Sequence, residues 1–468
     1  LEGQKLLKID DGGGFLSNFG GLPLAAKIIE KTGLLQMAVE RISEWRDPDR
    51  IDFSISELLT QRAFLAACGL PNAHDCSFWK DDPALKSVVH KDPDAPSLAS
   101  QSTHTRMENG LSKETIKRLE SLPLDFFFAQ HKHAPRNLTI YIDGTAIQTF
   151  GAQQNSTYRG GKKYSQTQYF PLIVTTDNGD LLLAQLRAGG DSDARSVATI
   201  SKLLLDIKEK WKNIQLTVVM DTGFNSPELL DLLEAEKILY VIGYPATSSV
   251  KINIKDICRS VAKEFQKRFG NPRYAGIHGS KLWQKEHQRI RALPAKQRMA
   301  AEKEQNQRHV RWAYQCHHNG VNWLSDRSVI HRVDFTDKGL DIRCVVTNIR
   351  NGLPDSIYEE KYCRRARIEM FIKEQKSHSK VPLSCQEFTA NQFRFALQSV
   401  AYIILHLLRK ELPTSLSPKS ILSVRKLLLL VPVRITTTPR RLLWSLSSVH
   451  PTSNCIVKMA KKLHARTA

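Results

Sequence analysis

Two aspartates each follow a stretch that reads as a buried strand. Asp143 ends the run that begins at Leu138, and Asp221 follows Leu216–Met220. Carboxylates at the carboxyl ends of strands converge on one edge of an α/β sheet, where sites form. Their hard oxygens suit Mg²⁺. A single acid after a strand is more often a turn or cap residue, so a metal site needs a third carboxylate.

A third carboxylate lies in a basic helical pattern, Y-x2-R-x3-E-x6-K, formed by Tyr362, Arg365, Glu369 and Lys376. On a regular helix these side chains fall within about 40° of one direction. A carboxylate among cations stays ionised, and those cations can hold phosphates. Taken alone, such a face is usually an i,i+4 salt bridge. Three converging acids can instead bind two Mg²⁺ ions that promote phosphodiester displacement.

The charge balance indicates a polyanionic partner. The 468 residues include 68 Lys+Arg and 47 Asp+Glu, a net charge of +21. This excess favours nucleic acid first and an anionic membrane surface second. Residues 251–312 hold 16 basic and 5 acidic side chains, and the chain after residue 410 holds 10 and 1. One such run is usually a solvated face, but two favour a DNA footprint.

Several classes of protein are excluded. The longest apolar stretches, 395–408 and 427–433, are too short or too polar to span a bilayer. The eight scattered cysteines contain no C-x2-C pair, which indicates reduced, cytosolic thiols, and Cys316-His317-His318 lacks a second ligand pair at zinc-finger spacing. His406 and Arg409 mimic a tyrosine-recombinase motif, but the required downstream nucleophile is missing because Tyr402 is the last tyrosine. No P-loop or H-E-x2-H pattern occurs.

The order of predicted elements indicates an RNase H-like α/β domain after a helical region at residues 20–130. Ser54 and Glu57 predict a capping box, and Gly69 ends that helix. Beyond residue 137 three strands occur in series, followed by helix, strand, helix and strand. The expected ranges are Leu138–Asp143, Tyr169–Thr176, Leu181–Leu186, Ser192–Trp211, Leu216–Met220, a helix from Ser226, and Leu239–Tyr244.

With these motifs in order, the chain resembles the bacterial insertion-sequence transposases of the cut-and-paste DDE group, whose third-acid signature is Y-x2-R-x3-E-x6-K. The resemblance covers about residues 20–450. Besides the signature, it rests on the segments 97–109, 141–145, 158–172, 186–189, 220–224, 345–348 and 388–409.

The resemblance implies both site and activity. Asp143, Asp221 and Glu369 match the catalytic, metal-binding triad, which holds two Mg²⁺ ions, with Mn²⁺ as a substitute. Tyr362, Arg365 and Lys376 match the residues that bind transposon-end DNA. The implied function is metal-dependent excision of an insertion sequence at its terminal inverted repeats and strand transfer into target DNA. The implied partners are double-stranded DNA and a second copy, as a homodimer in the synaptic complex, in a bacterial cytoplasm at the nucleoid.

The expected fold is an α/β, RNase H-like catalytic core with a β-rich insertion and helical N- and C-terminal regions. The expected segments are a helical DNA-binding region (1–132), the first part of the core (133–244), the insertion (245–355), the third-acid helix and its successor (356–410) and a basic C-terminal region (411–468). Trp312 and Trp323 could stack a flipped base in the insertion or simply form its core. Two alternatives remain: an inactive or domesticated transposase that only binds DNA, and a host RNase H-like nuclease.

Overall fold

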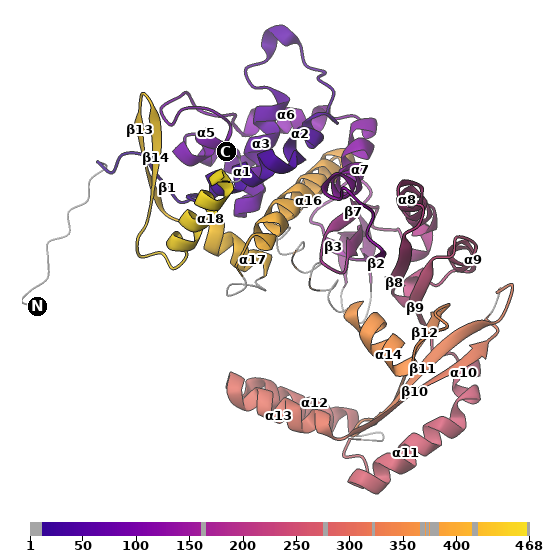
Figure 1. The fold of residues 1–468 in the computed structure, drawn as a ribbon. Coiled ribbons are helices and arrows are strands. Elements are labelled where there is room, and N and C mark those ends of the chain that lie inside the picture. The colour runs from indigo at the N-terminus through magenta and orange to yellow at the C-terminus, as the bar shows by residue number, and fades with distance from the viewer. Residues whose placement is uncertain are drawn as a thin grey trace, which may run out of the picture. The chain divides into compact units, whose positions relative to one another are not determined.

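The computed structural model describes residues 12–160, 165–274, 279–320, 323–365, 370, 374, 383–413 and 420–465. The chain forms two compact units, each assembled from separate stretches of sequence (Figure 1). We call them the sheet unit (Ala134–Asp143 and Ser192–Ile368) and the helical unit (Leu1–His133, Gly144–Asp191 and Glu369–Ala468). Among the described residues, no helix is long and apolar enough to cross a membrane.

The sheet unit is built on a mixed sheet whose strand order is β10-β11-β12-β9-β8-β2. Strands β2 (Asn137–Gly144), β8 (Gln215–Met220) and β9 (Leu239–Tyr244) run parallel to one another. Strands β12 (Gly339–Thr347), β11 (Arg327–Thr336) and β10 (His309–His318) continue it as an antiparallel meander. The parallel strands are nearly continuous apolar runs, as expected for strands buried on both faces. This mixed α/β architecture agrees with the α/β fold class expected from the sequence.

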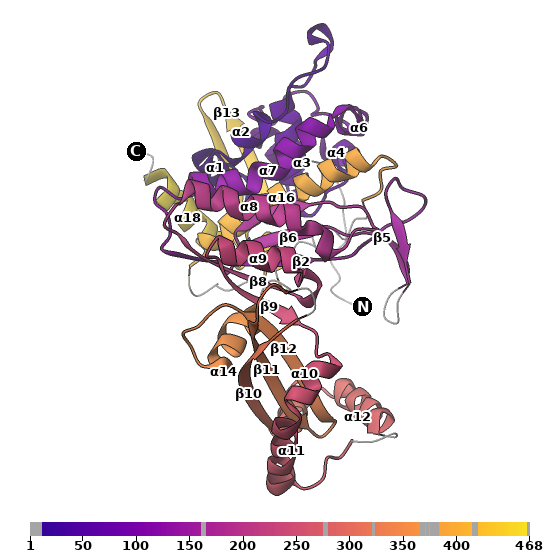
Figure 2. The same ribbon diagram turned by 90° about the vertical axis from the view of Figure 1, so that its right-hand side faces the viewer.

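Helices connect the parallel strands, because parallel neighbours need a crossover. Helix α8 (Val197–Lys210) follows a 3₁₀ turn at Asp193–Ser196 and buries Ile200, Leu203, Leu204 and Ile207. Helix α9 (Pro227–Ala235) begins as predicted, with the Ser226 hydroxyl accepting a hydrogen bond from the Leu229 amide. The two helices lie side by side (Figure 2).

The insertion is helical before it is β-structured, so the expectation of a β-rich stretch over 245–355 is wrong for its first half. The described residues of this half form the helices α10 (Ser248–Asn253), α11 (Lys255–Phe269), α12 (Gly279–Ala292) and α13 (Ala295–Gln307). These segments are rich in Lys, Gln, Glu and Ala, which are good helix formers. Helix α11 buries Val261 and Phe265 against Val333 of β11, which gives the insertion its own apolar core.

The N-terminal part of the helical unit consists of helices, as expected. The capping box of Ser54 and Glu57 is present at the start of α3, and Gly69 ends that helix in the left-handed conformation at φ 93°. Helix α3 packs on the long C-terminal helix α16 (Phe388–Lys410). The N-terminal helices are α1 (Leu22–Thr32), α2 (Leu34–Val39), α3 (Ile55–Cys68), α4 (Ala73–Trp79), α5 (Pro83–Val88), α6 (Gln101–Gly110) and α7 (Lys113–Gln130), with a 3₁₀ turn at Pro48–Arg50.

The predicted strand Tyr169–Thr176 is two strands. Pro171 has no amide hydrogen for a ladder, and the chain changes sheet there. Strand β5 (Gln166–Tyr169) pairs with β3 (Ile147–Gln148) and β4 (Thr157–Arg159), whereas β6 (Leu172–Thr176) forms a hairpin with β7 (Leu181–Gln185). Gly179 closes the predicted turn at φ 86°.

The C-terminal region is not purely helical, which corrects another expectation. Between α17 (Ile421–Val424), which runs on into a π turn at Arg425–Leu429, and α18 (Ser453–Ala465) lies a hairpin of β13 (Val433–Thr438) and β14 (Arg441–Leu446). Strand β1 (Leu16–Ser17) pairs with β13. The segment Val433–Thr438 is rich in β-branched residues, which favour a strand, and Pro439 and Arg440 form the turn of the hairpin.

Candidate active site

Asp143 and Asp221 leave the sheet at the same edge because their strands are in register. Ile142 of β2 is the neighbour of Met220 in the parallel β8, and each aspartate is the next residue along its chain. The Asp143 side chain is 15% exposed and that of Asp221 is 45% exposed. The sheet therefore brings one sheltered and one open carboxylate to neighbouring strand ends, as the sequence predicted.

Asp221 also shapes the turn that follows it. Its Oδ1 accepts a hydrogen bond from the Thr222 amide at 2.7 Å, at the start of a 3₁₀ turn, Thr222–Phe224. A Cβ at Gly223 would lie 2.7 Å from a carboxylate oxygen of Asp193, so the glycine leaves room for this neighbouring carboxylate. No sequence signal points to Asp193, because it belongs to no motif and opens an ordinary turn.

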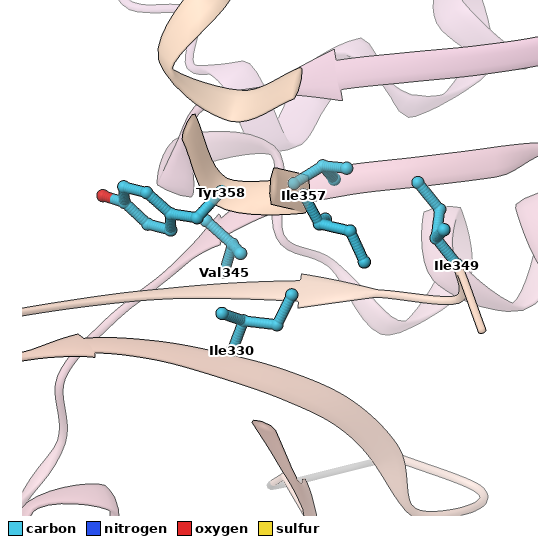
Figure 3. Packing of buried hydrophobic residues seen from close by; sticks show 6 residues of the cluster. Ile330, Val345, Ile349, Ile357 and Tyr358 are labelled. Carbon is cyan, nitrogen blue, oxygen red and sulfur yellow. The ribbon is translucent and has the colours of Figure 1, made fainter. Parts of the chain in front are cut away.

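The segment that carries Tyr362 and Arg365 is not the regular helix that the sequence predicted. One helical turn, α14 (Pro354–Ser356), continues as a π turn over Ile357–Tyr362 and a 3₁₀ turn over Cys363–Arg365. Ile357 and Tyr358 hold it on the sheet by packing against Val345 and Ile330 (Figure 3). Short π and 3₁₀ segments inside helices are frequent at functional sites.

The 3₁₀ turn places Arg365 over Tyr362, since residues three apart eclipse each other in that geometry. The Arg365 guanidinium carbon lies 5.7 Å from the centroid of the Tyr362 ring. The Tyr362 hydroxyl reaches the turn after Asp221, where a Cβ on Gly243 would be 2.8 Å from it and 2.5 Å from Thr222 Oγ1. A glycine inside a strand can mark such a close approach, and Gly243 is the sequence signal that could have located this contact.

Burial raises the pKa of the Tyr362 phenol, and the nearby Asp221 carboxylate raises that pKa further. Both effects disfavour the phenolate. The hydroxyl therefore stays protonated at neutral pH and can donate a hydrogen bond to an anionic oxygen. Arg365 opposes the shift of this pKa but does not reverse it.

One guanidinium nitrogen serves both aspartates. Arg365 Nη1 lies 3.5 Å from Asp143 Oδ2 and 3.8 Å from Asp221 Oδ2, and the Arg365 side chain is 17% exposed. The structure thus brings together four of the residues predicted from the sequence: Asp143, Asp221, Tyr362 and Arg365. Glu369 and Lys376 lie outside the described residues, and the roles of all six stay predictions.

Contacts with strands β10 and β11 hold the residues just before Tyr362 in place. Glu359 forms an ion pair with Arg311 of β10, with 2.6 Å between Oε1 and Nη1. The Arg332 guanidinium carbon lies 5.1 Å from the centroid of the Tyr358 ring, and that ring is 5.4 Å from the Tyr362 ring. The insertion strands therefore support the residues that approach the two aspartates.

The two tryptophans of the insertion differ. Trp312 is 44% exposed on β10. Trp323 packs beside Tyr244, with 5.3 Å between ring centroids, and under the guanidinium of Arg327 at 5.2 Å. The described structure thus gives Trp323 a packing role and leaves the Trp312 ring accessible.

The carboxylates suit a hard divalent cation. Both aspartates are oxygen donors on adjacent strand ends, and they already share one positive charge, that of Arg365. Among the described residues, no group of three or more His, Cys, Asp and Glu side chains could hold a metal ion. Cys316, His331 and Cys344 form only a hydrogen-bonded row, with 3.0 Å and 3.2 Å between the imidazole nitrogens and the two sulfurs. All eight cysteines lie in described residues, and none forms a disulfide.

Comparisons with known proteins were made for the family, for curated relatives and for solved structures. A family model described as "Transposase DDE domain group 1" matches residues 1–468, which agrees with the chemistry of the site. No curated protein matches the chain. Among solved structures, a piggyBac transposase synaptic complex with hairpin DNA is similar with a TM-score of 0.39 and 9% identity, over 86% of this chain and 78% of that one.

Proposed function

Because the chain belongs to the family Transposase DDE domain group 1, we propose that it is a DNA transposase of a bacterial insertion sequence. It excises the element at its terminal inverted repeats and transfers the freed strands into target DNA. The observation that carries this proposal is the pair of in-register aspartates, Asp143 and Asp221, joined by one guanidinium. In this proposal the sheet unit carries most of an RNase H-like core.

In this proposal the residues of the site divide into metal ligands and DNA contacts. Asp143, Asp221 and Glu369 hold two Mg²⁺ ions, for which Mn²⁺ can substitute. When bound, the ions activate the attacking oxygen and neutralise charge on phosphorus during in-line displacement. Arg365, with its planar fork of donors, binds a phosphate beside the scissile bond. The protonated Tyr362 hydroxyl donates to a neighbouring phosphate oxygen, and Lys376 adds a third contact to the same strand.

The charge distribution supports DNA as the partner. Besides the net charge of +21, helix α11 presents Lys255, Lys263 and Lys267 on its exposed side, at spacings of two turns and one turn. We assign end recognition to the helical N-terminal region and the basic C-terminal region, and synapsis of two ends to a homodimer acting at the bacterial nucleoid. Phosphate contacts of this kind make affinity fall steeply with salt, so a flat salt response would contradict this assignment.

Asp143→Asn tests the function directly. The substitution removes one ligand charge and keeps the shape of the side chain, so cleavage of end-containing DNA with Mg²⁺ should fall by roughly 10³-fold or more, as when electrostatic stabilisation of a transition state is lost. DNA affinity should change little. Asp206→Asn, in an exposed ion pair with Lys202 on α8, is the matched control and should cleave normally.

Cleavage near the wild-type rate in Asp143→Asn would contradict the assignment. Joining assays separate the remaining alternatives. A host nuclease would cut without joining and without preference for inverted repeats, and a domesticated transposase would bind ends without cutting them.

A further inference from the structure

The outer face of helix α6 carries uncharged hydrogen-bonding groups and one guanidinium. Its exposed residues are Gln101, Ser102, Arg106 and Asn109, and Thr105 is partly exposed between them. At 100° per residue, these five positions fall within an arc of about 140° on one side of the helix. Together they offer amide, hydroxyl and guanidinium groups to a partner, and none of the five is acidic.

These residues are unusual for a helix face that only meets water. Serine, threonine and asparagine form helices less readily than lysine and glutamate, because their short polar side chains compete for the backbone. Helix α8 shows the ordinary arrangement, in which Lys202 and Glu209 are exposed. Helix α6 therefore keeps its outer residues at some cost in helical stability, which indicates that they are suited to a contact.

The inner face of α6 fixes the helix to the core of the helical unit. His104, Met107 and Glu108 are 1%, 2% and 1% exposed. The Nε2 atom of His104 donates a hydrogen bond to Gln61 Oε1 of α3 at 3.0 Å. Glu108 is paired with Arg62 of the same helix at 2.6 Å. A helix held on a rigid element in this way presents its outer side chains at fixed positions, as precise recognition requires.

The two longest side chains of the outer face are also positioned. The Oε1 atom of Gln101 lies 3.2 Å from Nδ1 of His74 on α4, and the Gln101 backbone amide donates to Ser77 Oγ at 2.8 Å. Arg106 Nη2 donates to Thr103 Oγ1 at 3.3 Å. A glutamine amide has two N–H donors besides its oxygen, and a guanidinium has five N–H donors. Both groups can therefore bind a partner in these orientations.

The same groups match the edges of DNA bases. In the major groove, arginine binds O6 and N7 of guanine, and glutamine or asparagine binds N6 and N7 of adenine. A helix with its side chains is about 10–12 Å wide, and the groove is about 12 Å wide. From Gln101 to Asn109 the helix rises about 12 Å, the length of about three or four base pairs.

We propose, resting on the function above, that α6 lies in the major groove of the transposon end and reads its sequence through Gln101, Arg106 and Asn109. Lysines near both ends of the helix suit the flanking phosphates, which set the register of a bound helix. The Lys80 carbonyl accepts a hydrogen bond from the Leu98 amide, three residues before α6, and Lys113 begins α7 three residues after it. None of the five outer residues is apolar, so the face does not suit a membrane surface.

Binding of the full-length protein to two duplexes tests the proposal, read by fluorescence anisotropy. One duplex contains an inverted repeat from the DNA that flanks the gene, and the other contains the same bases in shuffled order. The wild type should prefer the repeat. Arg106→Lys keeps the charge and loses the planar fork, so affinity for the repeat should fall roughly tenfold, while affinity for the shuffled duplex should not change. Gln101→Ala should act in the same way.

Arg350→Lys is the matched control, because it makes the same change at an exposed arginine of the sheet unit, and it should alter neither affinity. If the wild type prefers the repeat and both α6 variants keep that preference in full, α6 does not read bases, and the proposed function stands. An equal loss of affinity for both duplexes would assign α6 to phosphate contacts alone and would also overturn the proposal. If the wild type binds both duplexes equally, recognition of transposon ends fails, and the proposed function fails with it.

Methylation interference on the inverted-repeat duplex locates the contact. A methyl group on guanine N7 blocks an arginine that binds there. At least one guanine of the repeat should therefore prevent binding by the wild type when it is methylated. The same methylated guanine should be tolerated by Arg106→Ala, while interference at the other positions stays. An interference pattern that is identical in the wild type and Arg106→Ala would remove Arg106 from the base contacts and overturn the proposal.

Discussion

Two arginine–carboxylate clusters in this chain differ in burial and in the distances between their charged groups. In the helical unit, Glu108 lies between Arg62 and Arg394, at 2.6 Å and 2.9 Å. In the sheet unit, Arg365 lies between Asp143 and Asp221, at 3.5 Å and 3.8 Å. The first cluster is closed, with Arg62 and Glu108 each 1% exposed. The second is open, because the Asp221 side chain is 45% exposed.

The difference separates a cluster that holds the fold from one that can bind. Glu108 joins α6 to α3 and α16, and its charge is fully neutralised by two guanidinium groups that water cannot reach easily. The Asp221 side chain of the second cluster, by contrast, keeps access to solvent. Exposure, more than the presence of an ion pair, therefore distinguishes a binding site from a structural contact.

The largest expected effect comes from breaking the closed cluster. Glu108→Gln leaves Arg62 and Arg394 facing each other without a carboxylate, and breaking a buried pair costs about 3–5 kcal/mol in unfolding free energy. Asp221→Asn, the matched change in the open cluster, should shift that free energy by less than about 1 kcal/mol, because asparagine can still cap the following turn. Urea denaturation of both variants measures the contrast. Equal losses in the two would show that exposure does not separate the clusters.

A second test compares these ion pairs with a buried carboxylate whose hydrogen-bond partners are neutral amide groups. Glu120 of α7 accepts hydrogen bonds from the side-chain amides of Gln185 and Gln392, and burial raises its pKa from 4.5 to about 7. The folded state therefore holds the proton more tightly than the unfolded chain. This contribution to stability is complete below pH 4.5 and is lost as the pH rises through 7.

Glu120→Gln should remove this pH dependence. Above pH 8 the variant should be more stable than the wild type by about 3 kcal/mol, the free energy that corresponds to the difference in pKa. Below pH 4.5 the two should unfold alike. Thermal unfolding across this pH range provides the test, and parallel stability curves would show that Glu120 titrates normally in the folded protein.

A third substitution, Gly243→Ala, perturbs the packing beside the open cluster without altering its charge. Gly243→Ala would put a methyl group 2.5 Å from Thr222 Oγ1 and 2.8 Å from the Tyr362 hydroxyl. Overpacking of this kind costs about 1–3 kcal/mol, and it should also displace Tyr362, which supports Arg365. Gly190→Ala, whose methyl group would meet nothing closer than 3.6 Å, is the control. Unfolding free energies and DNA affinities of both variants show whether the added methyl group acts on stability, on DNA binding or on both. Normal DNA affinity in Gly243→Ala would remove Tyr362 from the DNA contact.

The open cluster was easier to predict from the sequence than the closed one. Alternating and continuous apolar runs set the strands, so the amino-acid pattern alone places Asp143 and Asp221 at strand ends. Glu108 and Arg394 meet across 286 residues, and no local pattern encodes such a contact. The π and 3₁₀ turns before Arg365 also escaped prediction, because packing of Ile357 and Tyr358 on the sheet overrides regular helical spacing. In the first half of the insertion, the sequence was interpreted by its basic charge, so the helix-forming residues there were not used to predict helices.

The smallest expected effect comes from an ion pair whose two side chains are both exposed to solvent. Arg259 and Asp256 of α11 lie 3.1 Å apart, with side chains 62% and 92% exposed. Water solvates both charges whether or not they meet, so Arg259→Ala should change the unfolding free energy by less than about 0.5 kcal/mol. The short distance resembles that of the Glu108 cluster, and only the surroundings differ. A loss above about 1 kcal/mol in urea denaturation would mean that distance governs these clusters, and the contrast between closed and open pairs would then need another cause.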